Sequence, residues 1–133
     1  MATSYALVLA RLSAMAEREV EVLLGPEGLR IEDWRVLDHL AGSESATMSA
    51  LADAVLLTGP TLTRTVDKLV SLGFVHRSAS PDDRRKVLVH LTRRGSALQQ
   101  RLQPRVAESE MKALQTDSAD VALRRLASQL LAR

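Results

Sequence analysis

The stretch of sequence that decides the fold is GPTLTRTVDKLVSLGFVHRSASPDDRRKVLVHLTRRG, residues 59–95. Its first part predicts a helix over Gly59–Leu72, because a proline in the first turn loses no hydrogen bond. Gly73 can adopt the left-handed conformation that ends a helix, and Phe74 can fold back as the accompanying apolar contact. The buried stripe expected for this helix consists of Leu62, Val66, Leu69 and Val70.

A hairpin with a charged tip follows this helix. Residues 74–78 and 87–91 each predict a strand, because apolar residues in them alternate with polar ones or follow one another and include β-branched valines. The loop between them contains a proline and two aspartates. Asp83 is close enough along the tip to orient the guanidinium of Arg85, and Arg77 on the first strand is another candidate partner. Taken alone, the charge cluster at Asp82–Lys86 is typical of a solvated loop.

Positive charge is concentrated in this part of the chain. Residues 58–95 contain eight basic and three acidic side chains, whereas residues 1–57 contain four basic and nine acidic ones. The whole chain of 133 residues carries a formal net charge of only +2. A contiguous basic segment indicates a surface that faces a polyanion, and this favours a binding role for the hairpin tip over a solvated loop.

The remaining sequence is helical by pattern. Apolar residues at three- and four-residue steps predict helices over residues 1–24, 31–41, 92–111 and 119–131, with a short helix capped by Thr47 between them. Pro104 is expected to interrupt and kink the helix that contains it. The order short helix, tight turn, helix and charged hairpin predicts a mainly α fold with a small β-hairpin wing, which is a winged helix-turn-helix.

One series of motifs runs through this unit. It consists of Leu51-Ala52, Pro60–Arg64, Val66–Leu69, Leu72–Arg77, Asp83–Arg85, Val87–Val89 and Leu91–Gly95. The series resembles the MarR family of bacterial transcriptional regulators and covers residues 29–95 by motif. The resemblance implies a homodimer, usually a repressor, that is often released from DNA by a small phenolic or aromatic-acid ligand. The chain has no cysteine and therefore departs from the thiol-sensing members.

The resemblance also implies roles for individual residues. Pro60, Thr61, Thr63 and Arg64 are implied as recognition-helix contacts, Asp83 as the residue that orients the wing, and Arg85 as its minor-groove arginine. With its neighbours, the predicted interface with double-stranded DNA comprises Thr58, Gly59, Pro60, Thr61, Thr63, Arg64, Lys68, Arg77, Asp83, Arg84, Arg85 and Lys86. The alternative is a winged-helix module that binds protein through this surface and recognises no operator.

The first and last helices predict a dimer. Both lie outside the helix-turn-helix yet carry apolar stripes, and leaving such stripes in water costs about 25 cal/mol per Å². We therefore assign residues 1–28 to an N-terminal dimerisation helix, 29–95 to the winged helix-turn-helix DNA-binding domain, and 96–133 to C-terminal helices that complete the dimer interface. An intramolecular bundle of the terminal helices is the alternative. A two-fold dimer would present two recognition helices to a pseudo-palindromic operator.

A ligand pocket is expected between the dimer helices and the DNA-binding lobe, because effectors of the resembled family bind there. Candidate residues are Tyr5, Arg11, Trp34, Arg35 and His39. Trp34 and His39 also suit simple packing of the second helix or its rim. The sequence identifies no effector, although the resemblance implies a small aromatic or phenolic one.

Other functional classes find little support. His76 and His90 face each other across the predicted hairpin, but no third metal ligand follows at a typical spacing, so a structural role is favoured and we expect no metal. The absence of a phosphate-binding glycine loop or a paired nucleophile and base disfavours an enzyme, and no cofactor is expected. Without a signal peptide or a long apolar run, we expect a cytoplasmic protein with no membrane partner.

Overall fold

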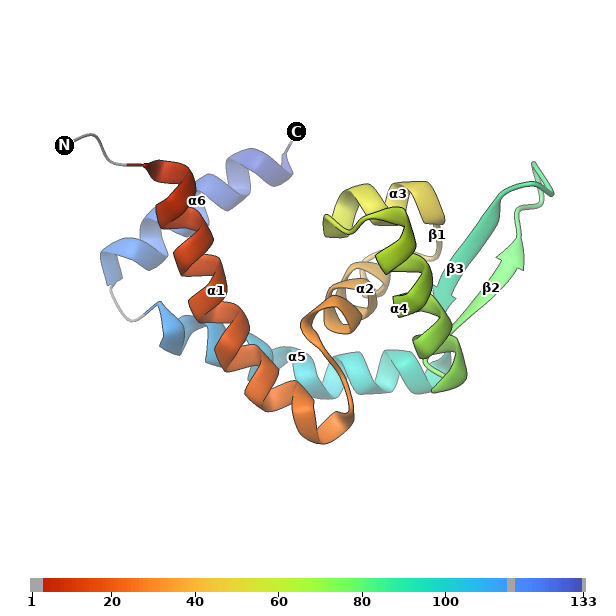
Figure 1. The fold of residues 1–133 in the computed structure, drawn as a ribbon, viewed down its shortest axis with the longest axis horizontal. Coiled ribbons are helices and arrows are strands. Elements are labelled where there is room, and N and C mark those ends of the chain that lie inside the picture. Colours follow the sequence, from red (N-terminus) through yellow and green to blue (C-terminus); the bar gives the residue numbers. More distant parts are fainter. Residues whose placement is uncertain (1–3, 115–116, 133) are drawn as a thin grey trace.

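The computed structural model describes residues 4–114 and 117–132, with side chains for 4–114 and 123–132. The elements, in chain order, are α1 (Tyr5–Leu24), the short 3-10 helix η1 (Gly25–Glu27), α2 (Ile31–Ala41), β1 (Ala46–Thr47), α3 (Met48–Val55), α4 (Gly59–Ser71), β2 (Val75–Ala79), β3 (Val87–Leu91), α5 (Arg93–Ala113) and α6 (Asp117–Leu131). The mainly α fold with a β-hairpin wing, predicted above, is confirmed. Figure 1 shows the wing at one end of the molecule and the start of α1 with α6 at the other.

Local signals in the sequence account for the ends of most helices. Ser4, Thr47, Thr58 and Thr92 each cap the helix that follows, because each hydroxyl accepts a hydrogen bond from a backbone N–H of the first turn. Gly73 takes a φ of 80° and ends α4 as expected, after which the Phe74 N–H donates to the Leu69 carbonyl over 2.9 Å.

The core joins the helix-turn-helix to α1 and α5. Its fully buried side chains include Val20 and Leu24 of α1, Leu37 of α2, Leu62 of α4 and Leu102 of α5. Helix α5 runs beneath both halves of the molecule in Figure 1, and α1 packs along it. The DNA-binding unit predicted from sequence therefore shares one apolar core with α1 and α5.

The sheet contains a strand that the sequence did not reveal. Strand β1 pairs antiparallel with β3, which in turn pairs antiparallel with β2, so the strand order is β1-β3-β2. A two-residue strand has no detectable hydrophobic period, and its partner Val89 lies more than forty residues further along the chain. The pairing holds the base of the wing against the segment that leads into α3.

Three expectations about the helices were wrong. Val70 is 37% exposed, because the buried face of α4 turns through Leu62, Thr65, Val66 and Leu69 and leaves Val70 on its flank. Helix α5 continues through Pro104 without the expected interruption, because Pro104 lies on the exposed face, where water can solvate the carbonyl that the proline leaves unbonded; the expected kink stays a prediction. Helix α1 begins at Tyr5, after its cap, whereas the prediction had the helix starting at residue 1; residues 1–3 lie outside the described part.

Candidate nucleic-acid interface and ligand pocket

The start of α4 carries a cluster of small hydroxyl groups. Thr58 caps the helix, and its Oγ1 lies 3.0 Å from Oγ1 of Thr61, which also accepts a hydrogen bond of 3.4 Å from Nη2 of Arg64. Thr63 Oγ1 donates to the Gly59 carbonyl over 3.0 Å. These contacts orient Arg64 along an exposed helix end whose side chains are short enough for another molecule to approach the backbone closely.

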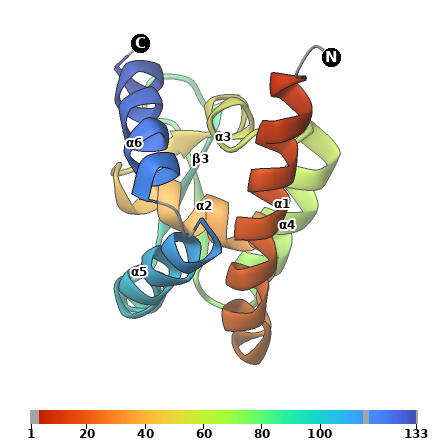
Figure 2. The ribbon, with the colours of Figure 1, turned by 90° about the vertical axis from the view of Figure 1, so that its left-hand side faces the viewer.

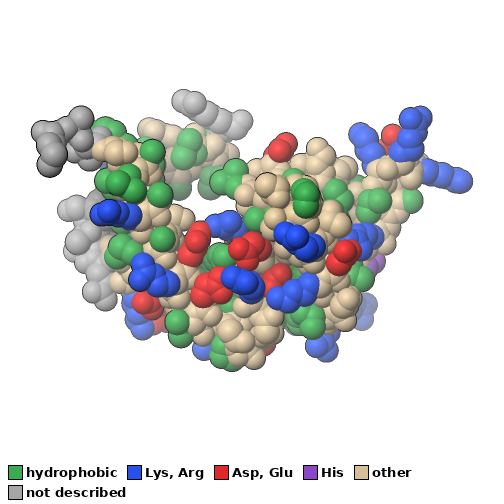
Figure 3. Space-filling view, in the orientation of Figure 1, with side chains coloured by type: hydrophobic (Ala, Val, Ile, Leu, Met, Phe, Trp, Pro, Cys, Tyr) green, Lys and Arg blue, Asp and Glu red, His purple; other side chains and the backbone are tan. Residues whose placement is uncertain are grey.

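The wing tip carries basic side chains, one of which is contacted by an aspartate. Asp83 Oδ1 accepts a hydrogen bond of 3.0 Å from the Arg85 N–H and lies 3.9 Å from Nε of the same residue. The predicted contact between Asp83 and Arg85 is therefore present. The Arg85 side chain is 95% exposed, and Arg84 and Lys86 are exposed beside it. Figure 3 shows these basic side chains gathered at the free end of the hairpin.

Two other predicted interface residues are held by acids. Arg77 Nη2 donates to Oδ1 of Asp67 on α4, so Arg77 pairs with the helix and not with an acid of the tip. Lys68 Nζ donates to Oδ2 of Asp33 over 2.5 Å. Both pairs brace α4, one against the wing and one against α2. Among the predicted interface cations in the described structure, Arg64, Arg84 and Lys86 have no acidic partner, and Arg85 has only Asp83 of the tip.

We define the α4–wing surface as Thr58, Gly59, Pro60, Thr61, Thr63 and Arg64 together with Asp83, Arg84, Arg85 and Lys86. Helix α4 and strand β2 pack against each other, which brings the two parts of this surface onto one lobe (Figure 1). The major groove of DNA is about 12 Å wide and admits one α-helix, and cations beside such a helix can contact the phosphates. The α4–wing surface can therefore contact base edges with one part and phosphates with the other.

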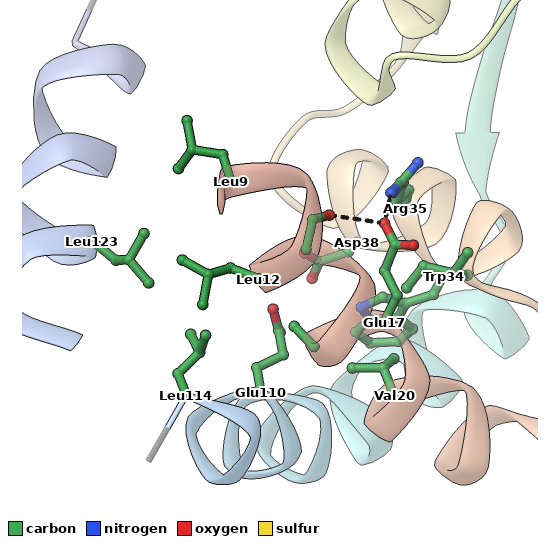
Figure 4. A pocket seen from close by; sticks show the side chains of 13 residues that line it. Leu9, Leu12, Glu17, Val20, Trp34, Arg35, Asp38, Glu110, Leu114 and Leu123 are labelled. Carbon is green, nitrogen blue, oxygen red and sulfur yellow. Dashed lines mark hydrogen bonds and ion pairs between the residues drawn. The ribbon is translucent and has the colours of Figure 1, made fainter. Parts of the chain in front are cut away.

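A second feature is a pocket of about 370 Å³ formed by α1, α2, α5 and α6. Its apolar walls, drawn in part in Figure 4, include Leu9, Leu12, Val20, Ile31, Leu114 and Leu123. Trp34 and Arg35 line it as well, so two of the five predicted ligand-site residues come together there. Tyr5, Arg11 and His39 are exposed and do not line it; Tyr5 is 77% exposed at the first turn of α1.

The pocket also contains acids that sequence reasoning missed. Glu17 accepts hydrogen bonds from Arg35 Nη2 and, over 3.1 Å, from Ser13 Oγ. Asp38 Oδ1 accepts a hydrogen bond of 3.1 Å from Gln99 Nε2. The carboxyl of Glu110 points into the pocket in Figure 4, where desolvation, and secondly the charge of Asp38, raise its pKa. These acids come from three helices, and no spacing in the sequence links them.

The two histidines of the hairpin are in contact, as predicted. Nε2 of His90 lies 2.8 Å from Nδ1 of His76, and their rings meet edge to face with centroids 3.6 Å apart. Burial, and secondly the charge of His76, lower the pKa of His90. Among the residues that the structure describes, no group of three or more potential ligands could hold a metal ion. None of the described helices has the length and apolarity needed to cross a bilayer.

Comparison with known proteins agrees with this architecture. The family model of the MarR family matches residues 27–86. The reduced form of MarR from E. coli superposes with a TM-score of 0.80 at 25% identity, covering 98% of both chains. A MarR mutant from E. coli complexed with operator DNA gives a TM-score of 0.80 at 25% identity, covering 95% of this chain and 92% of that one.

A third similar structure concerns ligand control. It is that of BpsR from Bordetella bronchiseptica, described as showing regulation of DNA binding by 6-hydroxynicotinic acid, with a TM-score of 0.82 at 20% identity over 98% of this chain and 94% of that one. No curated protein matches the chain by sequence. The fold is that of winged helix-turn-helix regulators of transcription. Over residues 27–86 the chain matches the MarR family, and its fold over nearly the whole chain is that of MarR from E. coli.

Proposed function

We propose that this protein is a DNA-binding transcriptional repressor that acts as a homodimer on a pseudo-palindromic operator and is released by a small molecule. The observation that carries the proposal is the α4–wing surface, where an exposed, hydroxyl-rich helix start and an arginine-bearing hairpin tip belong to one lobe. The MarR mutant seen with operator DNA has the same fold, which supports the assignment.

The two parts of the surface have different roles in this proposal. Thr61, Thr63 and Arg64 enter the major groove, while Arg85 reaches the adjacent minor groove or backbone, where narrow, electronegative stretches attract arginine. Asp83 orients Arg85, with Arg84 and Lys86 beside it on phosphates. Lys68 and Arg77 remain predicted contacts, but their acidic partners suit them better to holding α4 in position.

Dimerisation through the terminal helices is supported by apolar side chains that the single chain leaves in solvent. Exposed examples on α1 and α6 are Tyr5, Leu7, Val8, Leu9, Met15, Leu126, Leu130 and Leu131. In the described part of the chain α6 makes few contacts with other elements, and Figure 2 shows it standing apart from α1. A second copy is the partner that covers both faces and presents two recognition helices at once.

The pocket between α1, α2, α5 and α6 is the proposed effector site. It is lined by elements of the dimerisation helices and by α2, which packs against α4, so an occupant can change the position of the recognition helix. Regulation of DNA binding of BpsR by 6-hydroxynicotinic acid supports ligand control in a protein of this fold.

The experiment is a titration of the protein against its own upstream DNA at several salt concentrations. We expect binding to one site with a dissociation constant in the range of roughly 10⁻⁸ to 10⁻¹¹ M and a steep loss of affinity with salt. Arg64→Ala should weaken binding and reduce discrimination between operator and mutated operator. Weak binding that is indifferent to sequence would instead favour the protein-interaction module.

A further inference from the structure

The chemical class of the effector can be inferred from the charges inside the pocket. Among the described residues that line it, three are carboxylates, Glu17, Asp38 and Glu110, and one is a guanidinium, Arg35. With all four ionised, the lining carries a net charge of −2. A ligand that enters this space meets an excess of negative charge, and its own sign therefore affects its affinity.

Arg35, the one cation among the described lining residues, is already paired with Glu17. Arg35 Nη2 donates to Oε1 of Glu17, and the same carboxylate oxygen also accepts from Ser13 Oγ. A carboxylate or phenolate ligand would have to take Arg35 from Glu17 and leave that acid without its cation. Such a displacement opposes binding of an anion, because a half-buried charge that loses its partner costs free energy.

The other two acids have no cation of their own in the described structure. Asp38 accepts a hydrogen bond from the neutral amide of Gln99, and Glu110 faces the apolar side chains of Leu12 and Leu114 in Figure 4. Desolvation, with the charge of Asp38 as a second cause, raises the pKa of Glu110. A positive group placed between Asp38 and Glu110 would favour the ionised form of Glu110 and offset its repulsion by Asp38. The two carboxylates would in turn attract the positive group.

The rest of the lining suits an apolar body. Leucine and valine side chains from α1, with leucines at the end of α5 and on α6, form most of the remaining walls. The buried Trp34 adds an aromatic surface against which an apolar ring can pack. A space of about 370 Å³ is large enough for a ligand of one or two rings.

We infer that the pocket takes an amphipathic cation, an amine with an aromatic or alicyclic body, in preference to the phenolic or aromatic acids that the resemblance implies. The inference rests on the proposed function, in which this pocket is the effector site. The ammonium group lies against Asp38 and Glu110, and the apolar body lies against Trp34, between α1 and the side chains of Leu114 and Leu123. Binding of a cation here leaves the contact between Arg35 and Glu17 intact.

The test uses three nearly isosteric probes that differ in charge: 4-tert-butylbenzylamine, 4-tert-butylbenzyl alcohol and 4-tert-butylbenzoate. Trp34 is the only tryptophan of the chain, so its fluorescence reports occupancy of the pocket without any DNA. We expect the amine to bind at least about tenfold more tightly than the benzoate, with the alcohol between them. Tightest binding by the benzoate, equal binding of all three, or no response of Trp34 to any probe would each overturn the inference.

Variants locate the ammonium group. Glu110→Gln and, independently, Asp38→Asn should each weaken the amine about three- to tenfold and leave the alcohol within about twofold. Glu108→Gln is the matched control, because Glu108 lies on the same helix in an exposed pair with Lys112 and outside the pocket. If both pocket variants bind the amine as the unmodified protein does, the cation does not lie where we place it and the inference is wrong.

Operator binding is measured separately on the same preparations. A protein that selects the amine yet binds no operator would refute the proposed function and leave the charge preference of the pocket standing. A protein that binds its operator, but prefers the benzoate, would retain the proposed function and refute the inference.

Discussion

Lys68 of α4 donates a hydrogen bond of 2.5 Å to the carboxylate of Asp33, whose side chain is only 4% exposed in the first turn of α2. The same carboxylate oxygen accepts the Arg30 N–H over 2.8 Å and so caps α2. One buried acid therefore fixes the start of α2, which lines the pocket, and also the last turn of α4. The contact is a direct physical link between the two sites.

Removal of either partner should lower stability. Lys68→Met leaves a buried carboxylate without its cation, and Asp33→Ala loses both the ion pair and the helix cap. We expect each change to reduce the free energy of unfolding by about 2–4 kcal/mol, measured by urea denaturation. Lys112→Met, which breaks an exposed pair with Glu108, is the control and should cost less than about 0.5 kcal/mol. Equal costs for Lys68→Met and Lys112→Met would show that the buried pair contributes nothing special.

The wing makes a prediction about salt. Arg85→Ala should weaken operator binding and lower the slope of log affinity against log salt by about 1, because one phosphate-facing cation is lost. Dimerisation should not change, since Figure 1 shows the wing, whose tip contains Arg85, at the end of the molecule opposite to α6. Arg18→Ala removes the same charge from an exposed position on α1 and serves as the control. An unchanged slope for Arg85→Ala would remove the wing tip from the interface.

The sequence predicted those features whose determining residues lie close together in the chain, and missed those that depend on residues far apart. The limits of α4, its Gly73 end and the hairpin were predictable because the signals lie within a few residues of the feature. Strand β1, the Asp33 contact to Lys68 and the acids of the pocket were not, because each joins residues far apart in the chain. Trp34 and Arg35 were found since they share a helix that the resemblance placed beside the ligand.

Close packing at the start of α5 predicts that Gly95 cannot be replaced by alanine. A Cβ there would lie 1.9 Å from the carbonyl oxygen of Phe74, and no rotamer change can move a backbone atom. The oxygen also accepts the Thr92 N–H over 3.0 Å, so a shift would strain the cap of α5. We expect Gly95→Ala to lower the thermal midpoint and to reduce the free energy of unfolding, the latter by more than about 2 kcal/mol. Gly25→Ala, where no atom lies within 4 Å of the added carbon, should be nearly neutral.

The histidine pair predicts a loss of stability on mild acidification. His90 has a pKa below its ordinary value of 6.5, so the unfolded chain binds a proton at this position more readily than the folded one. Stability from this site is therefore complete above pH 6.5 and declines as the pH falls below it. Because the hairpin is largely exposed, we expect a loss below about 1 kcal/mol, measured by urea denaturation between pH 8 and 5. His90→Gln should remove this part of the decline, whereas His39→Gln, at an exposed site on α2, should preserve it.

Glu110 predicts the opposite dependence on pH. Desolvation, and secondly Asp38, hold its pKa above the ordinary value of 4.5, so the folded chain retains a proton that the unfolded chain has lost. The contribution of this group to stability is therefore favourable at low pH and is lost as the pH rises from 4.5 through the raised pKa. Glu110→Gln should then be more stable than the unmodified protein at pH 7, by no more than about 1 kcal/mol since the carboxyl is only partly buried, and equal to it near pH 4. A saturating amphipathic amine should reduce the advantage of the variant at pH 7, because the bound cation offsets the same unfavourable charge. If Glu110→Gln were less stable than the unmodified protein at pH 7, the carboxylate would have a compensating partner and the pocket would not carry the excess negative charge assigned to it.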